Sequence, residues 1–136
     1  MEMNKEQSLT SYLYHMQNSE WNLFEEMTHE DFEAKIHWTG MKYSKEEFIS
    51  LIKVLVEEDL DPRITKFEII SEINCSNYSV LQLRRKRHNE RPPECELLIA
   101  DWDDKKIRSL TIYNVDDLDH QLAGDWMKSF QSIKKY

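Results

Sequence analysis

Aspartate residues gather in two short stretches of this sequence, and grouped carboxylates can bind a metal ion. The two groups are Asp101, Asp103 and Asp104, and then Asp116, Asp117 and Asp119. Neither group has the D-x-D-x-D-G spacing of a calcium-binding loop. The first is typical of a hairpin turn, and the second of a helix N-terminus, where the helix dipole favours negative side chains. The five histidines show no H-E-x-x-H or other paired spacing. We therefore expect no metal site and no cofactor.

One run of basic residues, 84–91, lies between two strand-like stretches. Because alternate side chains of a strand face opposite sides, the run does not form one flat patch. We expect a solvated hairpin tip that also protects a sheet edge from aggregation. A site for phosphate or for an acidic partner is the alternative. The members of the run are Arg84, Arg85, Lys86, Arg87, His88 and Arg91.

The composition is that of one globular domain spanning residues 1–136, with 40% hydrophobic and 32% charged residues. The net charge of −8 disfavours nucleic acid and anionic membrane surfaces, and no aromatic residues interleave with the basic run to stack on bases. No signal peptide or long apolar run is visible, and Cys75 and Cys95 have no C-x-x-C spacing. These features predict a cytoplasmic protein without a membrane span.

Apolar periodicity predicts four helices. The first spans 5–17, where Leu9, Tyr12, Leu13 and Met16 form one stripe, and a short second helix carries Trp21 and Phe24. A third, at about 44–58, begins with the capping box Ser44-x-x-Glu47 and ends before Asp61-Pro62. An additional C-terminal helix is expected over 117–134.

Alternating and apolar stretches predict five strands at 32–38, 64–73, 78–88, 94–102 and 107–114. Gly40 ends the first of them. The short polar connections between the last four strands indicate an antiparallel meander. Helices first and strands later predict an α+β fold.

Two stretches, HWTGMKYSKEEFISLI and IADWDDKKIRSLTIYNVD, together with this order of elements, resemble the nuclear-transport-factor-2-like superfamily in its SnoaL-like branch. The resemblance covers about 110 residues. It implies a cone-shaped fold, in which N-terminal helices pack on a curved, mainly antiparallel sheet around an apolar pocket. The additional helix over 117–134 has no counterpart in this resemblance.

The resemblance also assigns side chains to the two faces of the sheet. The predicted pocket residues are Tyr12, Met16, Ile36, Trp38, Phe67, Leu98, Ala100, Leu110, Ile112 and Asn114. On the outer face it places Leu97, Ile99, Ser109, Thr111 and Tyr113. Because exposed apolar side chains there would be a liability in a monomer, we expect a homodimer through the outer sheet face.

Steroid isomerases of this superfamily use a tyrosine, a carboxylate base and a neutral carboxylic acid. The resemblance places Tyr12 at the tyrosine position, Ile36 at the base and Leu98 at the acid, so two roles are unfilled. Alternation directs His37 to the face opposite Ile36. Tyr12 and Glu96 remain candidate catalytic residues, with a core tyrosine and a solvated rim carboxylate as the alternatives.

Two functions are compatible with these residues and with the resemblance. In the first, the apolar pocket binds a small molecule with a ring or an acyl chain and one polar end. Trp38 would then stack on the ligand, the alternative being that it is an ordinary core residue. Asn114 would orient the ligand, the alternative being that it only ends a strand. In the second, the protein is a non-catalytic interaction module that uses the outer sheet face or the C-terminal helix.

Overall fold

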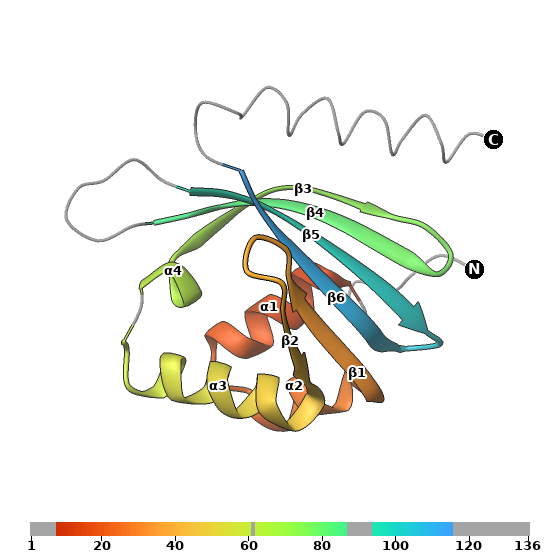
Figure 1. Cartoon of the computed structure of the whole chain (residues 1–136), viewed down its shortest axis with the longest axis horizontal. Coiled ribbons are helices and arrows are strands. Elements are labelled where there is room, and N and C mark those ends of the chain that lie inside the picture. Colours follow the sequence, from red (N-terminus) through yellow and green to blue (C-terminus); the bar gives the residue numbers. More distant parts are fainter. Residues whose placement is uncertain (1–7, 61, 87–93, 116–136) are drawn as a thin grey trace.

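The computed structural model describes residues 8–60, 62–86 and 94–115. Figure 1 shows helices on the concave side of a curved sheet of six strands, which is the α+β, cone-like architecture predicted from the sequence. The predicted C-terminal helix over 117–134 and the basic residues Arg87, His88 and Arg91 lie outside the described residues.

Three helices cover the concave face of the sheet. They are α1 (Leu9–Gln17), α2 (Trp21–Glu26) and α3 (Lys45–Glu57), each close to its predicted position. The predicted capping box at α3 is confirmed, because the Ser44 side chain accepts from the Glu47 amide and the Glu47 carboxylate accepts from the Ser44 amide. A second capping box at α1 joins Ser8 and Ser11, a pairing that was not predicted from the sequence.

A short helix, α4 (Pro62–Thr65), precedes the meander. The strand predicted from residue 64 is therefore wrong over its first residues. Proline is favoured at the first position of a helix, because it lacks the amide hydrogen that would be unpaired there. The strand begins only at Phe67.

The sheet has the strand order β2-β1-β6-β5-β4-β3. The last four strands form the predicted antiparallel meander, while β1 pairs with β6 in parallel. The strands are β1 (Thr28–Ile36), β2 (Met41–Ser44), β3 (Phe67–Asn74), β4 (Tyr78–Arg85), β5 (Glu94–Asp103) and β6 (Lys106–Val115).

The first hairpin differs from its prediction. Strand β1 starts at Thr28 and ends at Ile36, so Trp38 lies in the turn that leads to β2 rather than in the strand. Gly40, at φ 72°, adopts the left-handed conformation there, and its amide donates to the carbonyl of Ile36 at 2.9 Å. The short strand β2 was not predicted, because its alternation of apolar and polar residues extends over only four positions.

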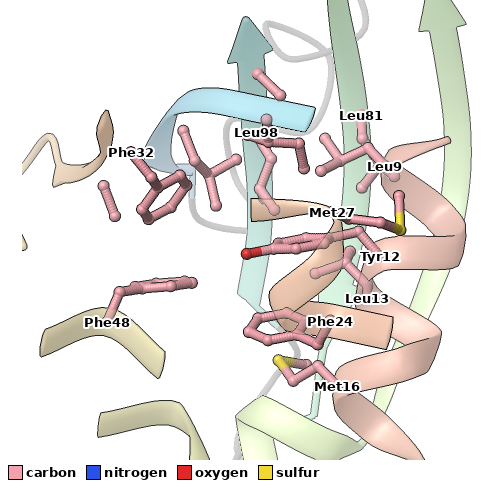
Figure 2. Packing of buried hydrophobic residues seen from close by; sticks show 14 of the residues in the cluster. Leu9, Tyr12, Leu13, Met16, Phe24, Met27, Phe32, Phe48, Leu81 and Leu98 are labelled. Carbon is pink, nitrogen blue, oxygen red and sulfur yellow. The ribbon is translucent and has the colours of Figure 1, made fainter. Parts of the chain in front are cut away.

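The main core lies between the helices and the concave face of the sheet (Figure 2). The rings of Tyr12 and Phe24 stack with their centroids 4.2 Å apart, and Phe48 of α3 packs against Phe32 of β1 at 5.3 Å. The sheet contributes a layer of leucines beneath them, which comprises Leu81, Leu83, Leu98 and Leu110.

Helix α1 is attached to the sheet by a carboxylate of β3. Glu72 accepts hydrogen bonds from the amides of Leu9 and Thr10, at 3.2 and 2.9 Å, and from the Thr10 hydroxyl. The amides at a helix N-terminus have no partner inside the helix, so Glu72 satisfies two of them from outside. A register shift between Ile69 and Ser71 in β3 precedes this contact.

The outer face of the sheet carries a second, smaller apolar cluster built on Ile73, Val80 and Leu97. Leu97 is only 1% exposed in the single chain, whereas Ile99 and Tyr113 are half-buried. Leu97 is therefore buried without a second subunit, and the homodimer through the outer sheet face stays a prediction.

Candidate functional site

An apolar cavity of about 170 Å³ lies between the helices and the concave face. Trp38 of the β1–β2 turn and Leu51 of α3 line it and are also exposed to solvent, so the cavity opens between these two elements. Seven of the predicted pocket residues line the cavity: Tyr12, Met16, Ile36, Trp38, Leu98, Leu110 and Ile112.

Three predicted pocket residues do not line the cavity. Ala100 is fully buried in the core, and Phe67 is half-buried beneath the Arg85 guanidinium, whose carbon lies 5.7 Å from the ring centroid. Asn114 is exposed near the end of β6, where its amide donates to Oε1 of Glu94 at 3.3 Å. Its position close to the strand end directs it to the rim rather than to the interior.

The helical side of the cavity includes residues for which the sequence predicted only helix packing or no role at all. They are Leu13, Phe24, Phe48, Leu51, Ile52, Leu55 and Ile64. The periodicity of the helical stretches indicated a buried face, but periodicity cannot distinguish a side chain packed in the core from one beside a cavity.

Tyr12 is fully buried, and its hydroxyl belongs to a closed hydrogen-bond chain. The Thr28 hydroxyl donates its hydrogen to the carbonyl of Phe24 at 2.8 Å. The Tyr12 hydroxyl lies 2.9 Å from the Thr28 oxygen, and because the Thr28 hydrogen is already used, Tyr12 is the donor of the bond between the two hydroxyls. Burial raises the pKa of Tyr12 well above its usual range, and the bond to Thr28 offsets this only in part. Tyr12 is therefore a neutral phenol whose proton is already engaged.

The charged part of the cavity wall is an ion pair between neighbouring strands. Nε of Arg85 in β4 lies 2.8 Å from Oε1 of Glu96 in β5, and both side chains are 8% exposed. Both residues line the cavity. The predicted solvated hairpin tip is therefore wrong for Arg85, and the solvated-rim alternative is wrong for Glu96. Strand alternation, which directs Arg84 and Arg85 to opposite faces, was the signal that pointed to an inward arginine.

The isomerase positions supply no acid–base group. Ile36 and Leu98 line the cavity as apolar side chains. His37 packs instead on Tyr113, with the two ring centroids 4.5 Å apart, and Tyr113 belongs to the outer-face cluster. A catalytic base and a second oxyanion donor are thus missing at these positions.

Two of the aspartates of the β5–β6 hairpin have protein partners. Asp101 accepts from the Ser109 hydroxyl at 2.7 Å, and Asp103 lies 3.1 Å from the imidazole of His29. Among the described residues there is no group of three or more side chains suited to hold a metal ion. Within the same residues, Cys75 and Cys95 are in no disulfide, and none of the helices has the length and apolar character needed to cross a membrane.

Comparison with known proteins gives matches by structure only. No protein-family model matches the sequence, and no curated protein matches it. An NTF-2-like protein of unknown function from Burkholderia xenovorans is similar, with 13% identity, a TM-score of 0.62, and coverage of 79% of this chain and 80% of that chain.

Two further solved structures are similar. A proposed SnoaL-like polyketide cyclase from Shewanella putrefaciens has 13% identity and a TM-score of 0.62, over 94% of this chain and 88% of that one. A protein with a ketosteroid isomerase-like fold from Catenulispora acidiphila, in complex with trimethylamine, has 11% identity and a TM-score of 0.61, over 77% and 82%. The cone of helices on a curved sheet and these matches together show that the chain has the nuclear-transport-factor-2-like fold.

Proposed function

We propose that this protein is a SnoaL-like small-molecule-binding protein whose ligand occupies the apolar cavity. The observation that carries the proposal is the cavity itself, which combines apolar and aromatic walls with one buried ion pair. Small-molecule sites are typically concave and apolar, with a few polar groups that fix the orientation of the ligand.

The volume of the cavity limits the ligand. A cavity of about 150 Å³ accommodates benzene, so about 170 Å³ suits a single ring or a short branched chain. Because Trp38 is 50% exposed at the opening, a larger ligand can extend past it towards solvent.

Binding is better supported than steroid isomerisation. The hydroxyl hydrogen of Tyr12 is engaged by Thr28, and the residues at the base and acid positions are Ile36 and Leu98. If a reaction does occur, Glu96 is the acid–base candidate in the cavity wall, because its carboxylate lies there beside Arg85.

The test is a titration of methyl-labelled protein with toluene, followed by NMR. We expect shift changes for the methyl groups of Leu98, Leu110 and Ile112, which line the cavity, and none for Ile73 and Val80 on the outer face. A Leu98→Phe variant fills the cavity and should lose the response. If the cavity methyls do not respond at saturating toluene, the proposal is wrong.

A stacking role for Trp38 has its own test. Trp38→Ala should weaken toluene binding with little loss of stability, since half of the side chain is already exposed. Native mass spectrometry of protein purified from its own host then searches for the natural ligand as a discrete additional mass.

The second candidate function is a dimeric interaction module. Ile99 and Tyr113 remain only half-buried on the outer face, which supports a partner there. Sedimentation equilibrium at micromolar concentration should give twice the monomer mass, and Tyr113→Glu should restore the monomer. A monomeric wild-type protein would contradict this candidate. The predicted cytoplasmic location stays a prediction.

A further inference from the structure

Three charged side chains lie together at one end of the concave face. Arg85 and Glu94 are opposite each other in the β4–β5 register, and Glu96 follows Glu94 by two positions on the same strand. Partners in register, and residues two apart, share a face of the sheet. All three are buried, which is unusual for residue types that are seldom inside a protein.

Within the described residues, this cluster holds two carboxylates and one guanidinium. Arg85 bonds Glu96 through Nε at 2.8 Å, and Glu94 accepts from the Asn114 amide. The neighbouring lysines of the described chain, Lys66 and Lys86, are exposed, so their charges are screened by solvent. Of these three side chains, Arg85 and Glu96 line the cavity, and their opposite charges are paired with each other. The sign of charge that a ligand can bring therefore depends on which atoms of this pair still face the cavity.

Glu96 is the member of this cluster through which a ligand can bind. It lines the cavity, and among the described residues only its Oε1 is engaged, by Arg85. Its Oε2 is thus an available hydrogen-bond acceptor on a residue that lines the cavity. A carboxylate oxygen accepts most strongly from a charged donor.

The cavity also has aromatic side chains that suit a cation. Trp38, Tyr43 and Phe48 line it, and the faces of aromatic rings attract ammonium groups. An anionic ligand would instead add a further negative charge beside Glu96, and Nε of the adjacent guanidinium is already bonded to that carboxylate.

We propose that the ligand of this cavity is a hydrophobic amine, bound as its ammonium ion with the charged end at Glu96 and the apolar body between the aromatic side chains. This inference rests on the proposed binding function, and it adds the chemical class of the ligand.

Four probes of nearly the same shape test the proposal by NMR titration at physiological ionic strength, where non-specific attraction to the acidic surface is screened. They are benzylamine, benzyl alcohol, toluene and benzoate. We expect benzylamine to bind about tenfold more tightly than benzyl alcohol, which corresponds to one charge-assisted hydrogen bond. Toluene should bind more weakly than benzyl alcohol, and benzoate should bind least.

Variants locate the preference. Glu96→Gln keeps an oxygen for Arg85 and should reduce the affinity for benzylamine to about that of benzyl alcohol, with toluene binding unchanged. The matched control is Glu68→Gln, the same substitution on the opposite face of the sheet, where Glu68 lies 3.8 Å from Arg84 and is 70% exposed. This control should retain the full preference for benzylamine.

The wild-type titrations decide the question even if Glu96→Gln does not fold. Toluene binding without a preference for benzylamine overturns this inference and leaves the proposed function intact. Tightest binding of benzoate also overturns it, since the cavity would then recognise anions through Arg85. If none of the four probes shifts the cavity methyls, the proposed function fails together with the inference.

Discussion

Two polar regions of the described core, one near Tyr12 and one at Arg85, differ in how completely their hydrogen bonds are satisfied. Near α1, the donors and acceptors of Tyr12, Thr28 and Phe24 form a chain in which each hydroxyl hydrogen has an acceptor. At the other region, Arg85 and Glu96 form a buried ion pair that borders the cavity, and within the described residues the second oxygen of Glu96 remains an available acceptor. The hydrogen-bond chain at Tyr12 therefore stabilises the fold, whereas the charged cluster still offers a hydrogen-bond acceptor to a ligand.

The largest expected effect is on the charged cluster. Arg85→Met leaves the Glu96 carboxylate buried without its guanidinium, and removing one partner of a buried ion pair costs about 3–5 kcal/mol. Urea unfolding measures this loss at neutral pH.

The control for this variant is Arg84→Met on the opposite face of β4. Arg84 lies 3.8 Å from Glu68, which is 70% exposed, so this substitution should cost less than about 1 kcal/mol. Equal losses for the two arginines would show that burial does not distinguish the two pairs.

The next largest effect is expected at the attachment of α1. Glu72→Ala removes the acceptor of the Leu9 and Thr10 amides, and hydrogen bonds to a charged group contribute about 1.5–3 kcal/mol. Chemical denaturation should show a loss of that size. Glu68→Ala, in the same strand but on its exposed face, should be nearly neutral, and a similar loss there would contradict the capping role of Glu72.

A smaller loss of stability is expected when the hydrogen-bond chain of Tyr12, Thr28 and Phe24 is interrupted. Tyr12→Phe removes one neutral hydrogen bond and leaves the bond from Thr28 to Phe24 intact, so we expect a loss of about 1 kcal/mol. The affinity for benzylamine should stay unchanged, because the Tyr12 hydroxyl donates its hydrogen to Thr28 and not to the ligand. The control is Tyr14→Phe, on the exposed side of the same helix. A selective loss of benzylamine affinity in Tyr12→Phe would show instead that the phenol contacts the ligand.

Much of the fold could be predicted from the sequence because it depends on local patterns. The stripe of Leu9, Tyr12 and Met16 predicts α1, and Ser44 with Glu47 predicts the start of α3. The parallel pairing of β1 with β6 could not be predicted from alternation, because alternation gives the face of a side chain and not its neighbouring strand.

The candidate site could be predicted only in part. Strand parity, fixed by the resemblance, directed Leu98 and Ile112 inward, where the cavity lies. The ion pair could not be predicted, because the side chains of a basic run next to a turn are usually exposed to solvent. In addition, the partner of Arg85 is 11 positions further along the chain. Only the register of β4 on β5 brings the two together.

The smallest effect is expected at the surface, in the capping box of α3. Its two hydrogen bonds between Ser44 and Glu47 are reciprocal, but they are exposed to solvent. The Ser44 amide, and then the Ser44 hydroxyl, lower the pKa of Glu47. A carboxyl whose pKa is lower in the folded state stabilises the protein fully above its unfolded pKa, and this contribution is lost as the pH falls through the folded pKa. Glu47→Gln should therefore melt slightly below wild type at pH 7 and converge with it under acidic conditions, with unchanged benzylamine affinity at pH 7. Parallel melting temperatures at all pH values would contradict the ionic contribution of the box.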